Sequence, residues 1–271
     1  MRIAPALSSI VVLLMTPLQL LFAQVVKEGE DRADVAPSNW SVGAAAGVRQ
    51  SLYAGEDSTV RAFPLIGYEG ERVYWRGLSL GYHLVRSETF VIDGFVAGRL
   101  DAVDADDFGR SELAARGIDR DLLEDRDDGA DVGMSASWRG DAGEIELSLR
   151  ADVTGASEGY EADLGYSYPI RLSSRVMLTP RVGVKFLSED LANYYYGTLQ
   201  EEVERGVPLY QPDSTVVPYV GLAAAVPFAE KWRLFGQVAY EALPSEIKDS
   251  PLIDEDAGRA GRAFLGVIYS F

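Results

Sequence analysis

The last eleven residues, 261–271, alternate between two unlike faces. One face is wholly apolar (Ala263, Leu265, Val267, Tyr269 and Phe271), and the other is mixed (Arg262, Phe264, Gly266, Ile268 and Ser270). Strict alternation is typical of a β-strand whose two faces meet different surroundings. The segment also has about the length that a tilted strand needs to cross a bilayer, roughly 9–11 residues. The feature therefore allows two fold classes, a soluble β-sandwich or a membrane barrel.

The N-terminus has the features of a secretory signal peptide. A short basic start, Met1-Arg2-Ile3, precedes an almost unbroken apolar run at 10–22. Residues 21–23 then provide a cleavage site, so we predict a signal peptide at 1–23. The polar residues 24–39 contain a proline, and we interpret them as a periplasmic lead-in to the fold.

The exported part of the chain lacks the features of the other membrane and secreted classes. The absence of cysteine excludes a lipid-anchoring cysteine and disulfides. After the signal, no apolar stretch approaches the roughly 20 residues of a spanning helix. Hydrophobic residues still make up 47% of the sequence, and alternation spreads them along it. Only helices and closed barrels satisfy their backbone groups in lipid, so the choice between sandwich and barrel remains.

Eleven alternating runs can be counted in the chain. They cover residues 40–50, 60–69, 72–85, 89–99, 132–138, 144–154, 160–170, 175–187, 216–228, 231–243 and 261–271. A barrel with both termini in the periplasm needs an even number of strands. The run 72–85 is long for one strand, and a break at Gly77 would give twelve. We therefore predict an all-β fold, a single transmembrane antiparallel β-barrel of twelve strands over residues 40–271, of the bacterial outer-membrane type.

The connections between these runs alternate between short and long. Residues 140–142, 173–174 and 229–230 form tight turns, whereas 101–131, 188–213 and 244–260 are long; 155–158 is the one short member of the long set. Outer-membrane barrels have short periplasmic turns and longer outer loops, which favours a barrel over a sandwich. The loop 101–131 has twelve acidic residues and four arginines, a net charge of −8, and a short helix is predicted at 111–123.

Several segments together resemble the MipA/OmpV family of outer-membrane proteins. They are spread over most of the exported chain, in the order 47–57, 63–70, 151–160, 194–197, 208–212 and 249–252. The resemblance implies a twelve-stranded outer-membrane barrel. For one member it implies a scaffold that brings a murein transglycosylase together with a murein synthase, and other members are described as adhesion, antigenic or stress-related surface proteins. The family has no agreed catalytic residues, so none is assigned.

Two features raise the question of chemistry. His83 is the only histidine and falls on the lumen side of its strand; a hydrolase would need it beside a nucleophilic serine or as a base activating water. No such motif accompanies it, so we expect a hydrogen-bonded lumen residue. Residues 125–129, Asp-Arg-Asp-Asp-Gly, suggest calcium, but their spacing fails the EF-hand template and favours a solvated loop.

The predicted lumen carries charges of both signs. They are Glu144, Glu146, Asp152, Glu161 and Asp163 against Arg150, Arg175, Arg181, Lys185 and Arg233. Opposite charges on neighbouring strands can pair, and a twelve-stranded barrel is narrower than the 16–18-stranded porins. We therefore expect a small or largely occluded pore. Aromatic residues near strand ends are expected to form interfacial girdles; they are Trp40, Trp75, Trp138, Tyr166, Tyr168, Trp232, Tyr240 and Tyr269.

The function predicted from the sequence is a non-enzymatic envelope scaffold linked to murein-processing enzymes. The alternatives are a narrow channel or solute-uptake barrel and an outer-membrane hydrolase. The expected partners are outer-membrane lipid and lipopolysaccharide, with a murein transglycosylase and a murein synthase; the net charge of −17 argues against nucleic acid. We expect a monomer located in the outer membrane and no cofactor. No catalytic, cofactor-binding or metal-binding residue is assigned.

Overall fold

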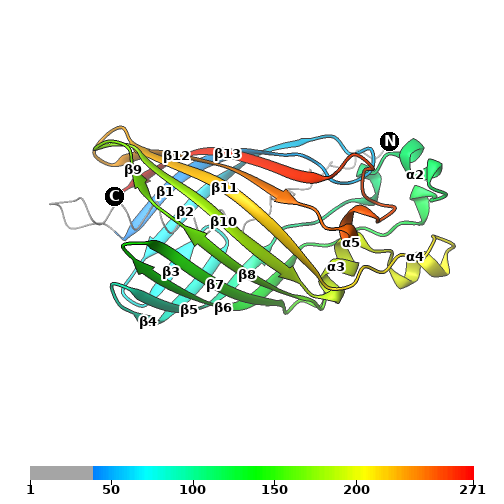
Figure 1. Ribbon diagram of the computed structural model, residues 1–271, viewed down its shortest axis with the longest axis horizontal. Coiled ribbons are helices and arrows are strands. Elements are labelled where there is room, and N and C mark those ends of the chain that lie inside the picture. The colour runs from blue at the N-terminus through cyan, green and yellow to red at the C-terminus, as the bar shows by residue number, and fades with distance from the viewer. Residues whose placement is uncertain (1–38) are drawn as a thin grey trace, which may run out of the picture.

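A computed structural model describes residues 39–271, which form one closed antiparallel sheet with helices at one end (Figure 1). The predicted signal peptide and nearly all of the predicted lead-in lie outside the described residues. The strands are β1 (Trp40–Arg49), β2 (Thr59–Glu69), β3 (Val73–Arg76), β4 (Ser79–Arg86), β5 (Phe90–Arg99), β6 (Gly129–Gly140), β7 (Gly143–Asp152), β8 (Tyr160–Ser167), β9 (Ile170–Arg171), β10 (Met177–Leu187), β11 (Thr215–Pro227), β12 (Trp232–Ala242) and β13 (Arg259–Ser270).

The sheet closes into a barrel with twelve strand positions. Neighbouring strands follow chain order, β13 pairs with β1, and β10 pairs with β11. The two-residue strand β9 pairs only with β10, directly after β8 on the same edge, so β8 and β9 share one position. Thirteen segments therefore make twelve positions, and the predicted fold and strand number are confirmed.

The long run at 72–85 is two strands, as predicted. Gly77 stands between β3 and β4 with φ of +60°, a left-handed conformation that glycine adopts without strain. β3 has only four residues, so this hairpin ends well before its neighbours do. The barrel wall is therefore shorter at β3 and β4 than elsewhere.

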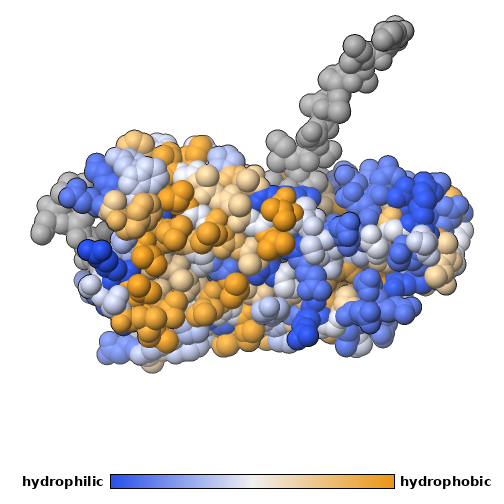
Figure 2. Space-filling view, turned by 90° about the horizontal axis from the view of Figure 1, so that it is seen from above, coloured by the Kyte–Doolittle hydropathy of each residue, from blue (hydrophilic) through white to orange (hydrophobic). Residues whose placement is uncertain are grey.

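The two faces of the sheet differ as the alternation predicted. On β13, Leu265 points outward and is 59% exposed, whereas Phe264 points inward and is buried. Figure 2 shows apolar side chains over the barrel wall and hydrophilic ones over the end that carries the helices. Seven of the eight predicted girdle aromatics lie near the short-turn end, and Tyr240 lies toward the other end of β12. These outward-facing apolar side chains form an apolar belt around the barrel wall, and the belt is the surface that a bilayer would cover.

Part of the inner wall is apolar. Phe235 and Phe264 pack inside with their ring centroids 6.1 Å apart, and small residues beside them leave room for the rings. The cluster comprises Ala45, Phe63, Leu65, Ala223, Ala225, Phe235, Phe264 and Ile268, from β1, β2 and β11–β13. Burying each large side chain is worth about 1.5–3 kcal/mol. One side of the lumen is thus filled by packing, and the polar groups lie on the other.

The helices belong to the long loops. They are η1 (Ala105–Asp107), α2 (Arg110–Ala115), η2 (Arg120–Leu122), α3 (Glu189–Tyr196), α4 (Gln200–Glu204) and α5 (Ser245–Lys248). The single helix predicted at 111–123 is instead α2 and η2, separated by Gly117, whose φ of +77° ends the first. Within residues 39–271, no helix has the length and apolar character needed to cross a membrane.

Candidate functional site

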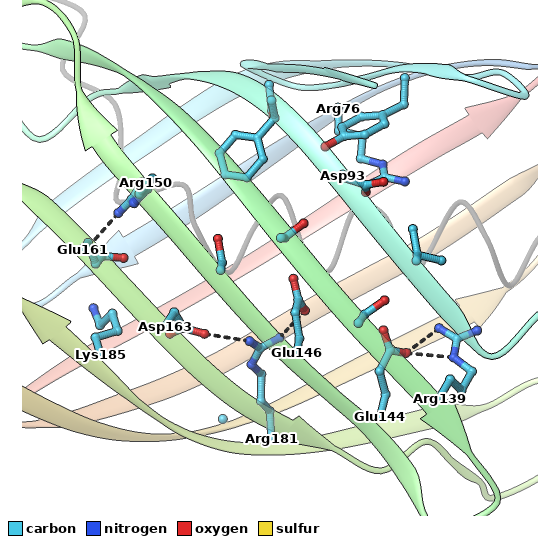
Figure 3. A pocket seen from close by; sticks show the side chains of 18 of the residues that line it. Arg76, Asp93, Arg139, Glu144, Glu146, Arg150, Glu161, Asp163, Arg181 and Lys185 are labelled. Carbon is cyan, nitrogen blue, oxygen red and sulfur yellow. Dashed lines mark hydrogen bonds and ion pairs between the residues drawn. The ribbon is translucent and has the colours of Figure 1, made fainter. Parts of the chain in front are cut away.

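The candidate site is the polar side of the lumen together with the loops that cover it. Inward side chains of β2–β8 and β10–β13 surround a cavity of about 120 Å³, measured as the space open to the centres of water molecules (Figure 3). Alternation along each strand turns every second residue inward. The charged residues that line the cavity are Glu69, Arg76, His83, Arg86, Asp93, Arg139, Glu144, Glu146, Arg150, Glu161, Asp163, Arg181, Lys185 and Arg262.

His83 lies in a buried network that spans four strands. Its Nδ1 is 2.6 Å from Asp93 Oδ1 and its Nε2 is 3.1 Å from Glu69 Oε1. Arg76 donates two hydrogen bonds to Glu69, at 3.0 and 2.9 Å, and its guanidinium lies 3.9 Å from the centre of the Tyr74 ring. The expected hydrogen-bonded lumen histidine is therefore found here.

The geometry around His83 limits what the imidazole can do. An ionised carboxylate only accepts hydrogen bonds, so with Asp93 and Glu69 both ionised each ring nitrogen would carry a hydrogen. A general base needs a free lone pair within reach of the proton that it removes. Both nitrogens of His83 already contact carboxylates, which hold the ring in place.

Further ion pairs join lumen side chains of strands that lie one or two positions apart in the barrel. Arg181 on β10 contacts Asp163 at 3.0 Å and Glu146 at 3.4 Å. Lys185 and Arg262 both lie 2.8 Å from Glu241. These charges neutralise one another across three or four strands, so they stiffen the barrel and leave little net charge facing the cavity.

A second group of ion pairs lies towards the long loops. Asp131 is fully buried between Arg99, at 2.8 Å, and Arg150, at 3.4 Å. Arg150 also pairs with Glu161 at 2.8 Å. Arg99 also lies 3.7 Å from Glu161, so each of these four charges has at least two partners of opposite sign, and the loss of one member would weaken the network without leaving a charge uncompensated.

Most of the charges predicted for the lumen line the cavity. Glu144, Glu146, Glu161, Asp163, Arg150, Arg181 and Lys185 do so. Arg175 does not: it lies exposed in the turn before β10, because that strand begins two residues later than predicted. Asp152 ends β7, where its carboxylate accepts hydrogen bonds from the backbone of the following turn. Arg233 shares the inward side of β12 with Phe235, outside the cavity lining.

The four longest loops pack together into a cap over one end of the barrel. We call residues 50–58, 100–128, 188–214 and 243–258 the cap. Its core contains buried apolar residues of all four loops: Leu52, Tyr53, Ala54, Val103, Phe108, Leu113, Ile118, Leu123, Leu191, Ala192, Tyr195, Val207, Leu243, Ile247, Leu252, Ile253 and Ala257. Figure 1 shows the helices gathered at this end, opposite the short turns. The outer loops are thus a folded unit.

Arg126 is the main polar link within the cap. Its guanidinium contacts Glu202 at 2.7 Å, and both side chains are buried. It also donates to the carbonyls of Tyr194, at 2.6 Å, and Glu124, at 2.7 Å. This one side chain therefore joins the loop 100–128 to α3 and α4.

The carboxylates of the acidic segment 125–129 accept hydrogen bonds from backbone amides of the same loop. Asp125 accepts a hydrogen bond from the Ala105 amide at 2.7 Å, and Asp128 accepts one from the Ala102 amide at 3.0 Å. Among residues 39–271, no group of three or more acidic, histidine or cysteine side chains could hold a metal ion. The carboxylates that suggested calcium in the sequence secure the two arms of the loop to each other.

The cap is the feature that the sequence did not predict. The sequence predicts the segments 101–131 and 188–213 only as long loops, the first of them acidic and with one short helix. A signal was present in Leu191 and Tyr195, which are four residues apart on α3 and are both buried. Helical spacing of apolar residues inside an acidic loop indicates packing rather than full solvation.

Comparison with known proteins agrees with the barrel. The profile described as "MltA-interacting protein MipA" matches residues 42–271. YiaT of Escherichia coli K12, whose name describes it as an outer-membrane protein, is 32% identical over 228 residues, 83% of this chain and 88% of YiaT. The MltA-interacting protein of the same strain is 29% identical over 258 residues, 95% of this chain and all of that protein.

Among solved structures, a NanC porin has a TM-score of 0.48 at 7% identity, covering 85% of this chain and all of the porin. The family match covers nearly every described residue, and the relatives are named as outer-membrane or interaction proteins. This chain is an outer-membrane β-barrel protein, and it belongs to the MltA-interacting protein (MipA) family.

Proposed function

We propose that the protein is a non-enzymatic scaffold that holds a murein-processing enzyme at the outer membrane. The observation that carries this proposal is that the barrel is filled and covered. The cap, which has its own apolar core, lies over one end, and the charged side chains of the lumen form ion pairs with one another. Such a barrel offers protein surface to the periplasm rather than a wide path for solutes.

The class of partner follows from the relatives. One of them is named an MltA-interacting protein, and the family resemblance implies a murein transglycosylase and a murein synthase. The geometry of His83 supports the non-enzymatic part, because both ring nitrogens are occupied by carboxylates. As a monomer, the barrel would present one set of short turns to such partners.

Site-specific crosslinking in living cells tests the scaffold. A photoreactive residue at Ser87, Asp141 or Ser174 would face the periplasm, and the same residue at Glu255 in the cap would face outward. We expect a murein transglycosylase or synthase in the products from the turns and none from the cap. Absence of both enzymes from every turn position would reject the scaffold.

A narrow channel is the second candidate, and the cavity of about 120 Å³ lined by both signs of charge favours it. Recording in planar bilayers separates the two. The scaffold predicts little or no steady current, because the cap and the ion pairs obstruct the lumen. A large, stable conductance would favour the channel and contradict the filled barrel.

A further inference from the structure

One part of the barrel wall is incomplete near the cap. β2 runs from Thr59 to Glu69, but β3 pairs with it only over residues 67–69. The last contact of the short hairpin is the hydrogen bond from Gly77 N to Ile66 O, at 3.0 Å. Within the described chain, residues 59–65 therefore pair with β1 alone. This stretch of β2 is an open edge in an otherwise closed sheet.

The open edge is apolar, and a proline removes one of its unpaired backbone N–H groups. Glu69 N donates towards β1, to Asn39 O, whereas Ile66 O faces the hairpin. Because backbone groups alternate sides along a strand, Val60, Ala62 and Pro64 face the open side. Pro64 has no N–H to leave unsatisfied there. The side chains of the same three residues point outward, and Val60 is 74% exposed.

A small pocket lies at this opening, between the ends of β1 and β2 and the start of the loop 100–128. It is lined by Arg49, Ser51, Tyr53, Glu56, Thr59, Arg61, Leu100, Asp101, Ala102 and Val103. Its volume of about 30 Å³, measured as for the lumen, holds about two or three water molecules. That is the scale of one phosphate group rather than of a sugar or a nucleotide.

Arginines form a row on the inner wall at this height. Arg49 on β1 lies directly opposite Arg262 on β13. Arg61 on β2 lies diagonally across from Arg49, since Gly47 pairs with Arg61 and Arg49 with Thr59. Like charges so placed repel one another. Arg262 is balanced by Glu241 at 2.8 Å, but within residues 39–271 neither Arg49 nor Arg61 has an ion pair within 4.0 Å.

Neither carboxylate of the pocket forms an ion pair within 4.0 Å with these two arginines, although Asp101 and Glu56 both attract Arg49 at longer range. Glu56 accepts a hydrogen bond from the Ser51 hydroxyl. Asp101 is only 8% exposed, its nearest ion pair is with Arg99 at 3.9 Å, and its Oδ1 has no hydrogen-bond partner. Burial raises the pKa of Asp101 above its usual range.

We propose that this pocket binds the phosphate head of an anionic amphiphile of the surrounding outer leaflet. Arg49 and Arg61 pair with the phosphate oxygens, as guanidinium groups do. The acyl chains lie outside, along Val60, Ala62 and Pro64. The exposed apolar edge favours a lipid over a soluble anion, and the site is independent of the proposed scaffold.

The test uses the mature protein in a neutral detergent. Dioleoyl phosphatidic acid is the probe and dioleoyl phosphatidylcholine the comparison, and bound lipid is counted by native mass spectrometry. The variants are Arg49→Gln, Arg61→Gln and the pair together. Arg175→Gln, which removes the same charge from an exposed turn at the other end, is the matched control.

Phosphatidic acid is expected to bind in preference to phosphatidylcholine. The double variant should weaken it about tenfold or more, since two charge-assisted contacts are lost, and Arg175→Gln should change it less than about twofold. Equal binding of both lipids by the native protein would overturn the site, and so would full binding by the double variant. Displacement of the lipid by inorganic phosphate at equal concentration would overturn the assignment to a lipid and leave a soluble anion instead.

Discussion

The buried Arg126 is expected to contribute strongly to the packing of the cap loops, beside their apolar core. Arg126→Leu would leave Glu202 buried with no cation, and breaking a buried pair in this way costs about 3–5 kcal/mol. The cost falls on the cap, because Arg126 contacts only loop residues there. We expect an added protease to cleave the variant within 188–214. The barrel itself should stay folded, so the unheated variant should have the same electrophoretic mobility as the unheated native protein.

An exposed ion pair of the same cap provides the control. Arg110 and Asp121 lie 2.6 Å apart, but their side chains are 56% and 63% exposed. Such pairs contribute about 0–1 kcal/mol, so Arg110→Leu should leave protease resistance nearly unchanged. Equal loss of protease resistance in both variants would show that the burial of an ion pair does not determine its contribution to the stability of the cap.

The lumen histidine is expected to matter for stability rather than for chemistry. His83→Gln would leave at least one of two carboxylates short of a donor, at a cost of about 1–3 kcal/mol. The measurement is the temperature at which the folded band disappears on a gel, which should fall. Cleavage of a lipid or peptide by the native protein that disappears in His83→Ala would contradict the non-enzymatic proposal.

At the scale of elements, the cap should be sensitive to alkali. Burial raises the pKa of Tyr53, Tyr195 and Tyr196 above the ordinary value of 10.0. Above that value the unfolded cap loses protons first, so the stability that neutral tyrosines contribute is complete below about pH 10 and declines as the pH rises further. Tyrosinate absorbance should therefore rise together with protease cleavage of the loops. Full ionisation near pH 10 without cleavage would show that these rings are not buried.

The strands could be predicted because one face of each strand meets lipid and the other meets the lumen, and this difference produces the alternating sequence pattern. Even the split at Gly77 could be predicted, from length and the even-number rule. The separation of β9 from β8 was missed, although Pro169 inside the predicted run 160–170 is a signal of the break that the structure shows at Tyr168 and Pro169. The cap was missed because its core joins residues of four separate loops, and no local period connects Leu52 with Leu252. Most of the lumen charges lay on predicted inward positions, with Arg175 in an exposed turn instead, whereas the partners in each ion pair depend on register.

At the scale of the whole molecule, the apolar belt predicts behaviour in solution. Exposed residues such as Leu265 and Val60 leave a surface that water would drive to aggregate. The mature protein should remain monodisperse only with detergent, and it should migrate differently before and after boiling because a closed sheet resists unfolding in the cold. A monodisperse protein in plain buffer after cell lysis would contradict the membrane barrel.

The bridge between Tyr53 and Ile253 joins the first outer loop to the last. These residues are two hundred positions apart, and β1 meets β13 directly beneath them. A nascent barrel that has not yet joined its first and last strands cannot bring the two halves of this contact together. Completion of the cap is therefore a late step of biogenesis, and a protease that digests only unfinished loops could time the moment at which the cylinder seals.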